Sequence, residues 1–122
     1  MQTAHRKSSF HSVTPLIPAG RSLADALAYF TGQLGFSIVW QGGNMAGVAR
    51  DGVTLNLIEN DDKGWAENTS LSIGVSDLEA LYEEYRGLSE VGKLEMKFWG
   101  RREFHLIAPS GVCFQFYQQE TA

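Results

Sequence analysis

The chain has 122 residues, of which 43% are hydrophobic and 20% are charged, and its formal net charge is −4. These values are typical of one globular domain, and an acidic balance without a basic stripe argues against nucleic acid as a partner. No apolar run approaches the roughly 20 residues of a membrane span, and the polar start lacks the apolar segment of a secretion signal, so we expect a cytoplasmic protein.

The first half of the chain predicts one strand, one helix and three more strands. The first strand is expected over Phe10–Ile17, and its two prolines limit it to an edge or a domain-exchange position. Ser22 is typical of a helix N-cap, with Asp25 three residues later, and apolar residues then recur at helical spacing until Gly35. Glycine-containing turns separate the next strands, which are Phe36–Gln41, Met45–Arg50 and Val53–Glu59.

The second half of the chain follows a polar loop over Asn60–Asn68, which carries the large aromatic Trp65. Strand character resumes over Thr69–Val75, and Ser76 begins a second helix with leucines and tyrosines on one face. Three further strands are predicted at Leu94–Trp99, Arg102–Ala108 and Val112–Gln118.

The predicted order of elements therefore occurs twice, as two βαβββ units. The two helix starts match at a constant offset of 54, since Ser22 corresponds to Ser76. Each unit is too small to bury its sheet alone, so we expect an α+β fold in which two modules form a curved mixed sheet around a shared cleft. The predicted boundaries are a polar tail at 1–9, one domain over 10–118 with modules 10–60 and 69–118, and a tail at 119–122.

The last hairpin carries the pattern Trp-Gly-x-Arg-Glu-Phe at residues 99–104, then x-Pro-x-Gly and an aromatic-rich strand. It resembles the last hairpin of the bleomycin-resistance branch of the vicinal oxygen chelate superfamily, also called the glyoxalase/bleomycin resistance/dioxygenase superfamily. Residues 27–30 followed by Leu34-Gly35-Phe36 are similar to that family's motif at the end of its first helix, with the aromatic pair inverted.

The resemblance covers about residues 10–118 and implies a function. Bleomycin-resistance proteins are homodimers whose crevices bind a large, cationic, aromatic antibiotic and sequester it without altering it. We therefore expect a homodimer in which strands or the N-terminal segment are contributed across the interface. The expected partner is a small-molecule ligand, such as bleomycin.

Strand alternation indicates which side chains face the predicted cleft. In Val53–Leu57 and Thr69–Val75 the apolar residues pack on the helices, which leaves small polar side chains on the other face. The cleft-facing set is Thr54, Asn56, Ser70, Ser72, Gly74, Gln115 and Tyr117. The cleft floor is therefore predicted to be small, neutral and polar.

The resemblance also indicates where a metal ion would bind in this chain. Metal-dependent members of the superfamily hold one divalent ion with His, Glu or Gln, which suits metals that prefer N and O ligands. The corresponding positions here fall near Thr14, Asn56 or its neighbour Leu55, Ser70 and Gln115. Only Gln115 is a plausible ligand, and His11 lies near the first position but on the opposite face. We therefore expect no metal, no cofactor and no catalytic residue.

Aromatic and acidic side chains are the further candidates for ligand binding. Trp40, Trp65 and Trp99 lie at strand ends or in loops, where they can stack on a planar ligand and attract cations. The alternative is that they close the core or a dimer interface. Acidic residues near Trp65, such as Asp61, would give that loop a negative potential suited to a cationic ligand.

Charged residues of the last hairpin have two interpretations. Arg102 and Glu103 match the family hairpin and are alternatively an ion pair that shapes the strand end. Glu103 and His105 share a strand face, and we interpret them as an ordinary contact rather than an acid/base couple. The candidate ligand-binding residues are Trp40, Asn56, Asp61, Trp65, Ser70, Trp99, Arg102, Glu103 and Gln115.

The functional prediction is thus a metal-independent small-molecule binder of the bleomycin-resistance type. Two alternatives stay open at this point. One is a divergent metal-dependent lyase, dioxygenase or thiol transferase of the same superfamily. The other is an interaction protein whose cleft is vestigial.

Overall fold

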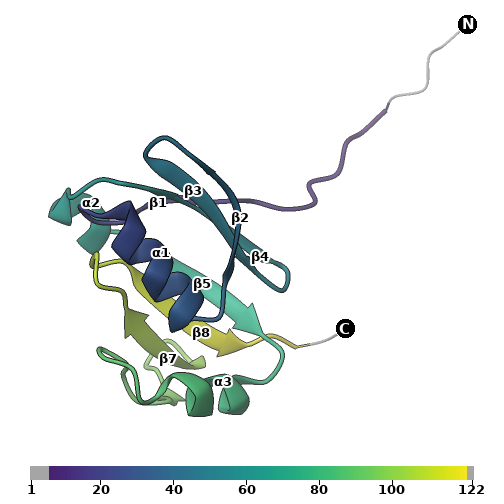
Figure 1. Cartoon of the computed structure of the whole chain (residues 1–122). Coiled ribbons are helices and arrows are strands. Elements are labelled where there is room, and N and C mark those ends of the chain that lie inside the picture. The colour runs from purple at the N-terminus through teal and green to yellow at the C-terminus, as the bar shows by residue number, and fades with distance from the viewer. Residues whose placement is uncertain (1–5, 121–122) are drawn as a thin grey trace, which may run out of the picture.

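Figure 1 shows a computed structural model of the protein, which describes residues 6–120. The first module contains β1 (Leu16–Pro18), α1 (Leu23–Gly32), β2 (Ser37–Gly42), β3 (Met45–Arg50) and β4 (Val53–Ile58). The second contains β5 (Ser70–Val75), α3 (Leu78–Tyr85), β6 (Glu95–Met96), β7 (Arg102–Ile107) and β8 (Cys113–Gln118). A short helix, α2 (Lys63–Glu67), connects them. The predicted pair of βαβββ modules is confirmed, and no helix within residues 6–120 is long and apolar enough to cross a membrane.

Each module forms its own four-stranded sheet with the same arrangement of strands. The orders are β1-β4-β3-β2 and β5-β8-β7-β6. In both sheets the first and last strands of the module are parallel neighbours, and the remaining pairs are antiparallel. Both sheets are therefore mixed, as expected, and the two modules match strand for strand.

Helix α1 joins the two sheets through one shared core (Figure 1). Ser22 caps the helix by accepting a hydrogen bond from the backbone N–H of Asp25 at 3.1 Å, as predicted. The buried stripe of α1 packs on the first sheet and also reaches the second, where the Phe30 ring meets Phe114 of β8 edge to face with centroids 6.1 Å apart. Each sheet consequently has one packed face and one open face.

A charged contact also links the modules at the end of β3. The Arg50 guanidinium lies 2.8 Å from the carbonyl oxygen of Leu34, 2.8 Å from the Glu84 carboxylate and 2.9 Å from the Tyr85 hydroxyl. The buried Tyr85 hydroxyl in turn donates to Leu34 at 2.5 Å. Burial raises the pKa of Tyr85, so this hydroxyl stays protonated and can donate. The end of α1 is therefore tied to α3 of the other module.

The first strand is shorter than predicted. Strand β1 begins only at Leu16, and three residues pair with β4. Before it, the Pro15 carbonyl oxygen accepts from the backbone N–H of Asn56 at 2.9 Å. Residues 6–15 have no regular secondary structure, and Figure 1 shows them leading away from the body of the protein. Phe10 and Val13 are exposed in this segment. The expected strand over Phe10–Ile17 is thus wrong for most of its length.

Two helix boundaries also differ from the sequence prediction. The polar loop contains α2, because the Asp62 side chain accepts a hydrogen bond from the backbone N–H of Trp65 at 3.1 Å and caps a helical turn. In the second module the N-cap is Asp77 rather than Ser76. The two caps, Ser22 and Asp77, therefore lie 55 residues apart, one more than the predicted offset of 54.

Candidate functional site

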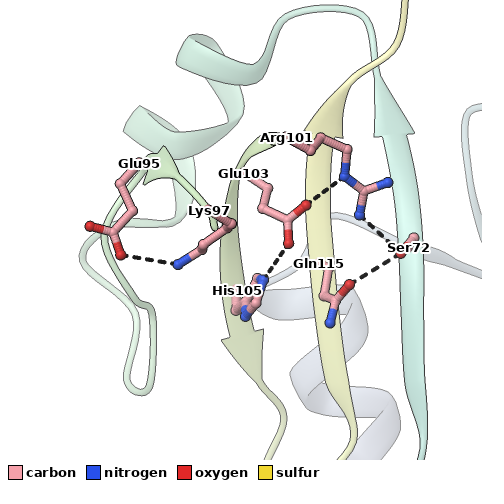
Figure 2. Close-up of polar contacts among 7 residues, drawn as sticks. All are labelled: Ser72, Glu95, Lys97, Arg101, Glu103, His105 and Gln115. Carbon is pink, nitrogen blue, oxygen red and sulfur yellow. Dashed lines mark hydrogen bonds and ion pairs between the residues drawn. The ribbon is translucent and has the colours of Figure 1, made fainter. Parts of the chain in front are cut away.

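The open face of the second sheet gathers polar side chains from three strands, and Figure 2 shows it. We call it the second-sheet face. It exists because phenylalanine and leucine alternate inward along β7 and β8, which turns the residues between them outward. Its members are Ser70, Ser72, Arg101, Glu103, His105, Cys113, Gln115 and Tyr117.

Glu103 is the centre of this face. Its side chain has no exposed surface, because neighbouring side chains cover it. Arg101 Nε donates to one carboxylate oxygen at 2.5 Å, and His105 Nε2 lies 2.7 Å from the other (Figure 2). Burial opposes ionisation of Glu103, but hydrogen bonds from His105 and Arg101 outweigh it and lower its pKa below the ordinary value. The carboxylate is therefore ionised and accepts from both neighbours.

The same contacts hold flat groups in fixed orientations. The Trp99 indole is stacked on the His105 imidazole, with an interplanar angle of 13° and centroids 6.1 Å apart. The Arg101 guanidinium lies over the Tyr117 ring, 4.0 Å from its centroid. A hydrogen-bonded network of this kind is rigid, so the second-sheet face presents aromatic and cationic surface without a cost of reordering it on binding.

Hydrogen bonds extend the network across β8 to β5. Arg101 donates to the Ser72 hydroxyl at 3.2 Å, and Ser72 donates to the side-chain oxygen of Gln115, also at 3.2 Å (Figure 2). Gln115 is the direct neighbour of Ser72 on one side and of His105 on the other. The Gln115 amide NH₂ is thereby left as a donor on this face.

The ion pair between Arg102 and Glu103, which was one of two interpretations of these residues, does not form. Strand alternation turns Arg102 to the packed side, where it forms an ion pair with Glu79 of α3. Glu103 takes its charged partner from Arg101 instead. Arg101 was missed as a candidate, although its spacing of two from Glu103 and four from His105 would have placed all three on one strand face.

Trp40 and Asn56 lie on the open face of the first sheet. The Trp40 indole covers Gly47 of β3, where a Cβ atom would come within 2.1 Å of Nε1, so glycine leaves the room for the ring. Gly47 is the register neighbour of Asn56, whose side-chain oxygen is buried without a hydrogen-bond partner within residues 6–120. Trp40 stays 42% exposed. This face therefore offers a broad aromatic surface beside an unused acceptor.

The remaining candidates lie beside α2. Asp61 forms an ion pair with Lys63 at 3.2 Å, and both residues line a cavity of about 380 Å³ between α1 and the turn before β8. Trp65 is a half-buried residue of α2 itself. The structure thus distributes the nine candidates over four places: Ser70, Trp99, Glu103 and Gln115 at the second-sheet face, Trp40 and Asn56 on the first sheet, Asp61 and Trp65 at α2, and Arg102 against α3. Their roles in ligand binding stay predictions.

The two open faces do not meet within one chain. It is the packed faces that meet across α1, so the open faces are turned outward. Within residues 6–120 the structure brings together no group of three or more His, Cys, Asp or Glu side chains that could hold a metal ion.

Acid should remove the contribution of Glu103 to stability. Because the folded pKa is lowered, this contribution is fully present above the unfolded value near 4.3 and is lost as the pH falls through the folded value. We expect urea denaturation to show wild type more stable than Glu103→Gln at pH 7, with the difference shrinking from about pH 5 downward. A difference that stays constant or grows toward pH 3 would contradict this.

Comparison with known proteins supports the fold. No family model matches the sequence, and a search of curated proteins finds no match. Solved structures do match over most of the chain. A member of the glyoxalase/bleomycin resistance/dioxygenase superfamily from Sphaerobacter thermophilus has 21% identity and a TM-score of 0.67, covering 90% of this chain and 98% of that one. The chain thus has the fold of this superfamily.

Bleomycin-binding proteins are among the similar structures. One from bleomycin-producing Streptomyces verticillus, complexed with copper(II)-bleomycin, has 27% identity and a TM-score of 0.83, covering 93% of this chain and 100% of that one. Another, complexed with bleomycin, has 23% identity and a TM-score of 0.80, covering 91% and 100%. The resemblance to the bleomycin-resistance branch, expected from the last hairpin, is confirmed.

Proposed function

We propose that the protein binds a large, flat antibiotic of the bleomycin kind and sequesters it unchanged, without a metal ion of its own. The observation that carries this proposal is the second-sheet face, where Glu103 holds His105 and Arg101 in place and Trp99 stacks on His105. Such a surface suits stacking and hydrogen bonding, and nothing in it resembles a nucleophile with an adjacent base. The similar structures that contain bleomycin support the same function.

We further propose that the binding crevice lies between two copies of the chain. Each open face lacks a facing wall within its own chain, and a second copy would supply one. Large apolar side chains are exposed at the places where such a copy would pack, in the N-terminal segment, β1, β2 and the approach to β7. These residues are Phe10, Val13, Leu16, Ile38, Val39, Trp40, Met96, Phe98 and Trp99. An exposed apolar surface of this extent is typical of an interface.

A cationic ligand would gain from the segment beside α2. The charges of the second-sheet face are balanced, since Arg101 pairs with Glu103 and Lys97 with Glu95. The stretch 61–67 holds Asp61, Asp62 and Glu67 against Lys63 alone, so its net charge is negative. The stretch 61–67 would attract a cationic ligand without belonging to the second-sheet face.

Titration of the metal-stripped protein with metal-free bleomycin tests the proposed function. We expect saturable tryptophan-fluorescence and calorimetric signals with about one ligand per chain, unaffected by added metal. Trp99→Ala should weaken binding about tenfold, because it removes a stacking surface that is already held in place.

Trp65→Ala is the matched control for this titration, because Trp65 belongs to α2 rather than to the second-sheet face. Loss of binding in Trp65→Ala alone would move the ligand to the α2 segment. Failure of wild type to bind bleomycin in the absence of metal, with binding or turnover once Ni²⁺, Mn²⁺ or Fe²⁺ is added, would contradict the proposal and favour a metal-dependent enzyme.

A further inference from the structure

We propose that His105 is a hydrogen-bond acceptor for the bound ligand, and that Glu103 is the positioning residue that makes it one. The inference rests on the proposed function, because it assigns a role within the same crevice. We infer that the second-sheet face binds a ligand group that carries an N–H or O–H donor next to an acceptor, as a carboxamide does.

The argument begins with the contact between His105 and Glu103. Only 2.7 Å separates Nε2 of His105 from a carboxylate oxygen of Glu103. An ionised carboxylate can accept a hydrogen bond but cannot donate one, so Nε2 must carry the proton. In a neutral imidazole the proton on one nitrogen leaves a lone pair on the other. Nδ1 of His105 is therefore the acceptor.

The position of Nδ1 makes that acceptor available. The His105 side chain is 25% exposed, and the side-chain hydrogen bond that it forms within residues 6–120 is made by Nε2, not by Nδ1. Stacking of Trp99 on one face of the ring prevents it from turning away. A fixed ring with an unused lone pair at the surface offers a ligand one directed acceptor.

Side chains next to His105 supply hydrogen-bond donors. Gln115 lies beside His105 in the sheet, and because its oxygen accepts from Ser72, its NH₂ group is the part of the amide that remains as a donor. Arg101 adds N–H donors over Tyr117. Acceptor and donors thus lie side by side, in the arrangement that a carboxamide, with its own N–H and C=O, can pair with at both ends.

Nitrogen NMR of the imidazole tests the first half of the inference in the free protein. In the neutral form of His105 we expect the ¹⁵N shifts to show a proton on Nε2 and none on Nδ1. Glu103→Gln should alter this tautomer, because an amide can also donate. A proton on Nδ1 in the wild-type protein would overturn the inference whatever the binding result.

Binding of metal-free bleomycin tests the second half. His105→Phe keeps a ring for Trp99 to stack on but has no acceptor, and we expect it to weaken binding about fivefold to tenfold. His105→Asn places an oxygen near the position of Nδ1 and should retain most of the affinity. Addition of bleomycin should also move the Nδ1 signal of wild type.

The outcomes separate this inference from the proposed function. Tight binding by wild type and equally tight binding by His105→Phe would overturn the role of His105 alone. Weakened binding in both variants would assign His105 a packing role and also overturn it. Absence of binding by wild type would contradict the proposed function, and the acceptor role would fall with it.

Discussion

Replacing Phe114 by alanine is expected to destabilise the protein by about 4 kcal/mol. Phe114 is 1% exposed, and its ring contacts both Phe30 of α1 and Phe116 on its own strand. Truncation would leave a cavity at the point where α1 meets the second sheet, so the loss includes contacts between the modules as well as within one. Domains of this size are stable by only about 5 to 15 kcal/mol.

Urea denaturation followed by circular dichroism measures this loss, and Phe98→Ala is the control. Phe98 is 96% exposed in one chain but belongs to the proposed interface, so both variants are compared at a protein concentration low enough to dissociate a dimer. There the same truncation should change the free energy of unfolding by less than about 0.5 kcal/mol. Comparable losses in the two variants would mean that α1 does not join the sheets as described.

Replacing Phe10 and Val13 together by serine is expected to weaken dimerisation by about a thousandfold or more. Both side chains are exposed in a segment that leads away from the body of the chain, so they contribute little to the stability of one copy. In a symmetric dimer each copy would bury its Phe10 and Val13 against its partner. The loss of dimerisation free energy would therefore be twice that of one pair of side chains. Because the proposed crevice needs two copies, bleomycin binding should be lost together with the dimer.

Analytical ultracentrifugation over a range of concentrations measures the dimer, with His11→Ser plus Thr14→Ser as the matched control. Those positions lie in the same segment but carry polar side chains, so the dimer should be unchanged. A monomeric wild type would disprove the crevice between copies. A dimer that tolerates the Phe10 and Val13 changes would place the interface elsewhere.

The fold could be predicted from sequence where side-chain periodicity was complete. Alternation in β4, β5 and β8 assigned the packed and open faces correctly, as shown by buried Leu55, Leu57 and Phe114. The Ser22 cap was also predicted, because it acts within one turn of chain. Repetition of the element order then indicated the two modules.

Features that depend on distant partners could not be predicted. An apolar stretch such as Phe10–Ile17 looks like a strand, but a strand also needs a neighbour, and most of this segment has none. Helix α2 is a single capped turn with a glycine in it, which weakens any helical signal.

The candidate site was predicted in part for the same reason. Glu103 and Gln115 follow from alternation, whereas the choice of Arg101 over Arg102 as the partner of Glu103 depends on where the strand starts. Trp40 was identified, but the need for Gly47 beneath it appears only when β2 and β3 are paired.

The parallel pairing of each module's first and last strands also determines when the chain can finish folding. Strand β5 cannot pair until β8 has been synthesised. In that pair Ser72 of β5 lies opposite Gln115 of β8, more than 40 residues later in the sequence. Helix α1 meets Phe114 on that same strand, so its apolar stripe cannot be fully covered until Phe114 has been synthesised. Contacts this distant in sequence form slowly, because a long loop must close first. The first module is therefore synthesised early but completed last.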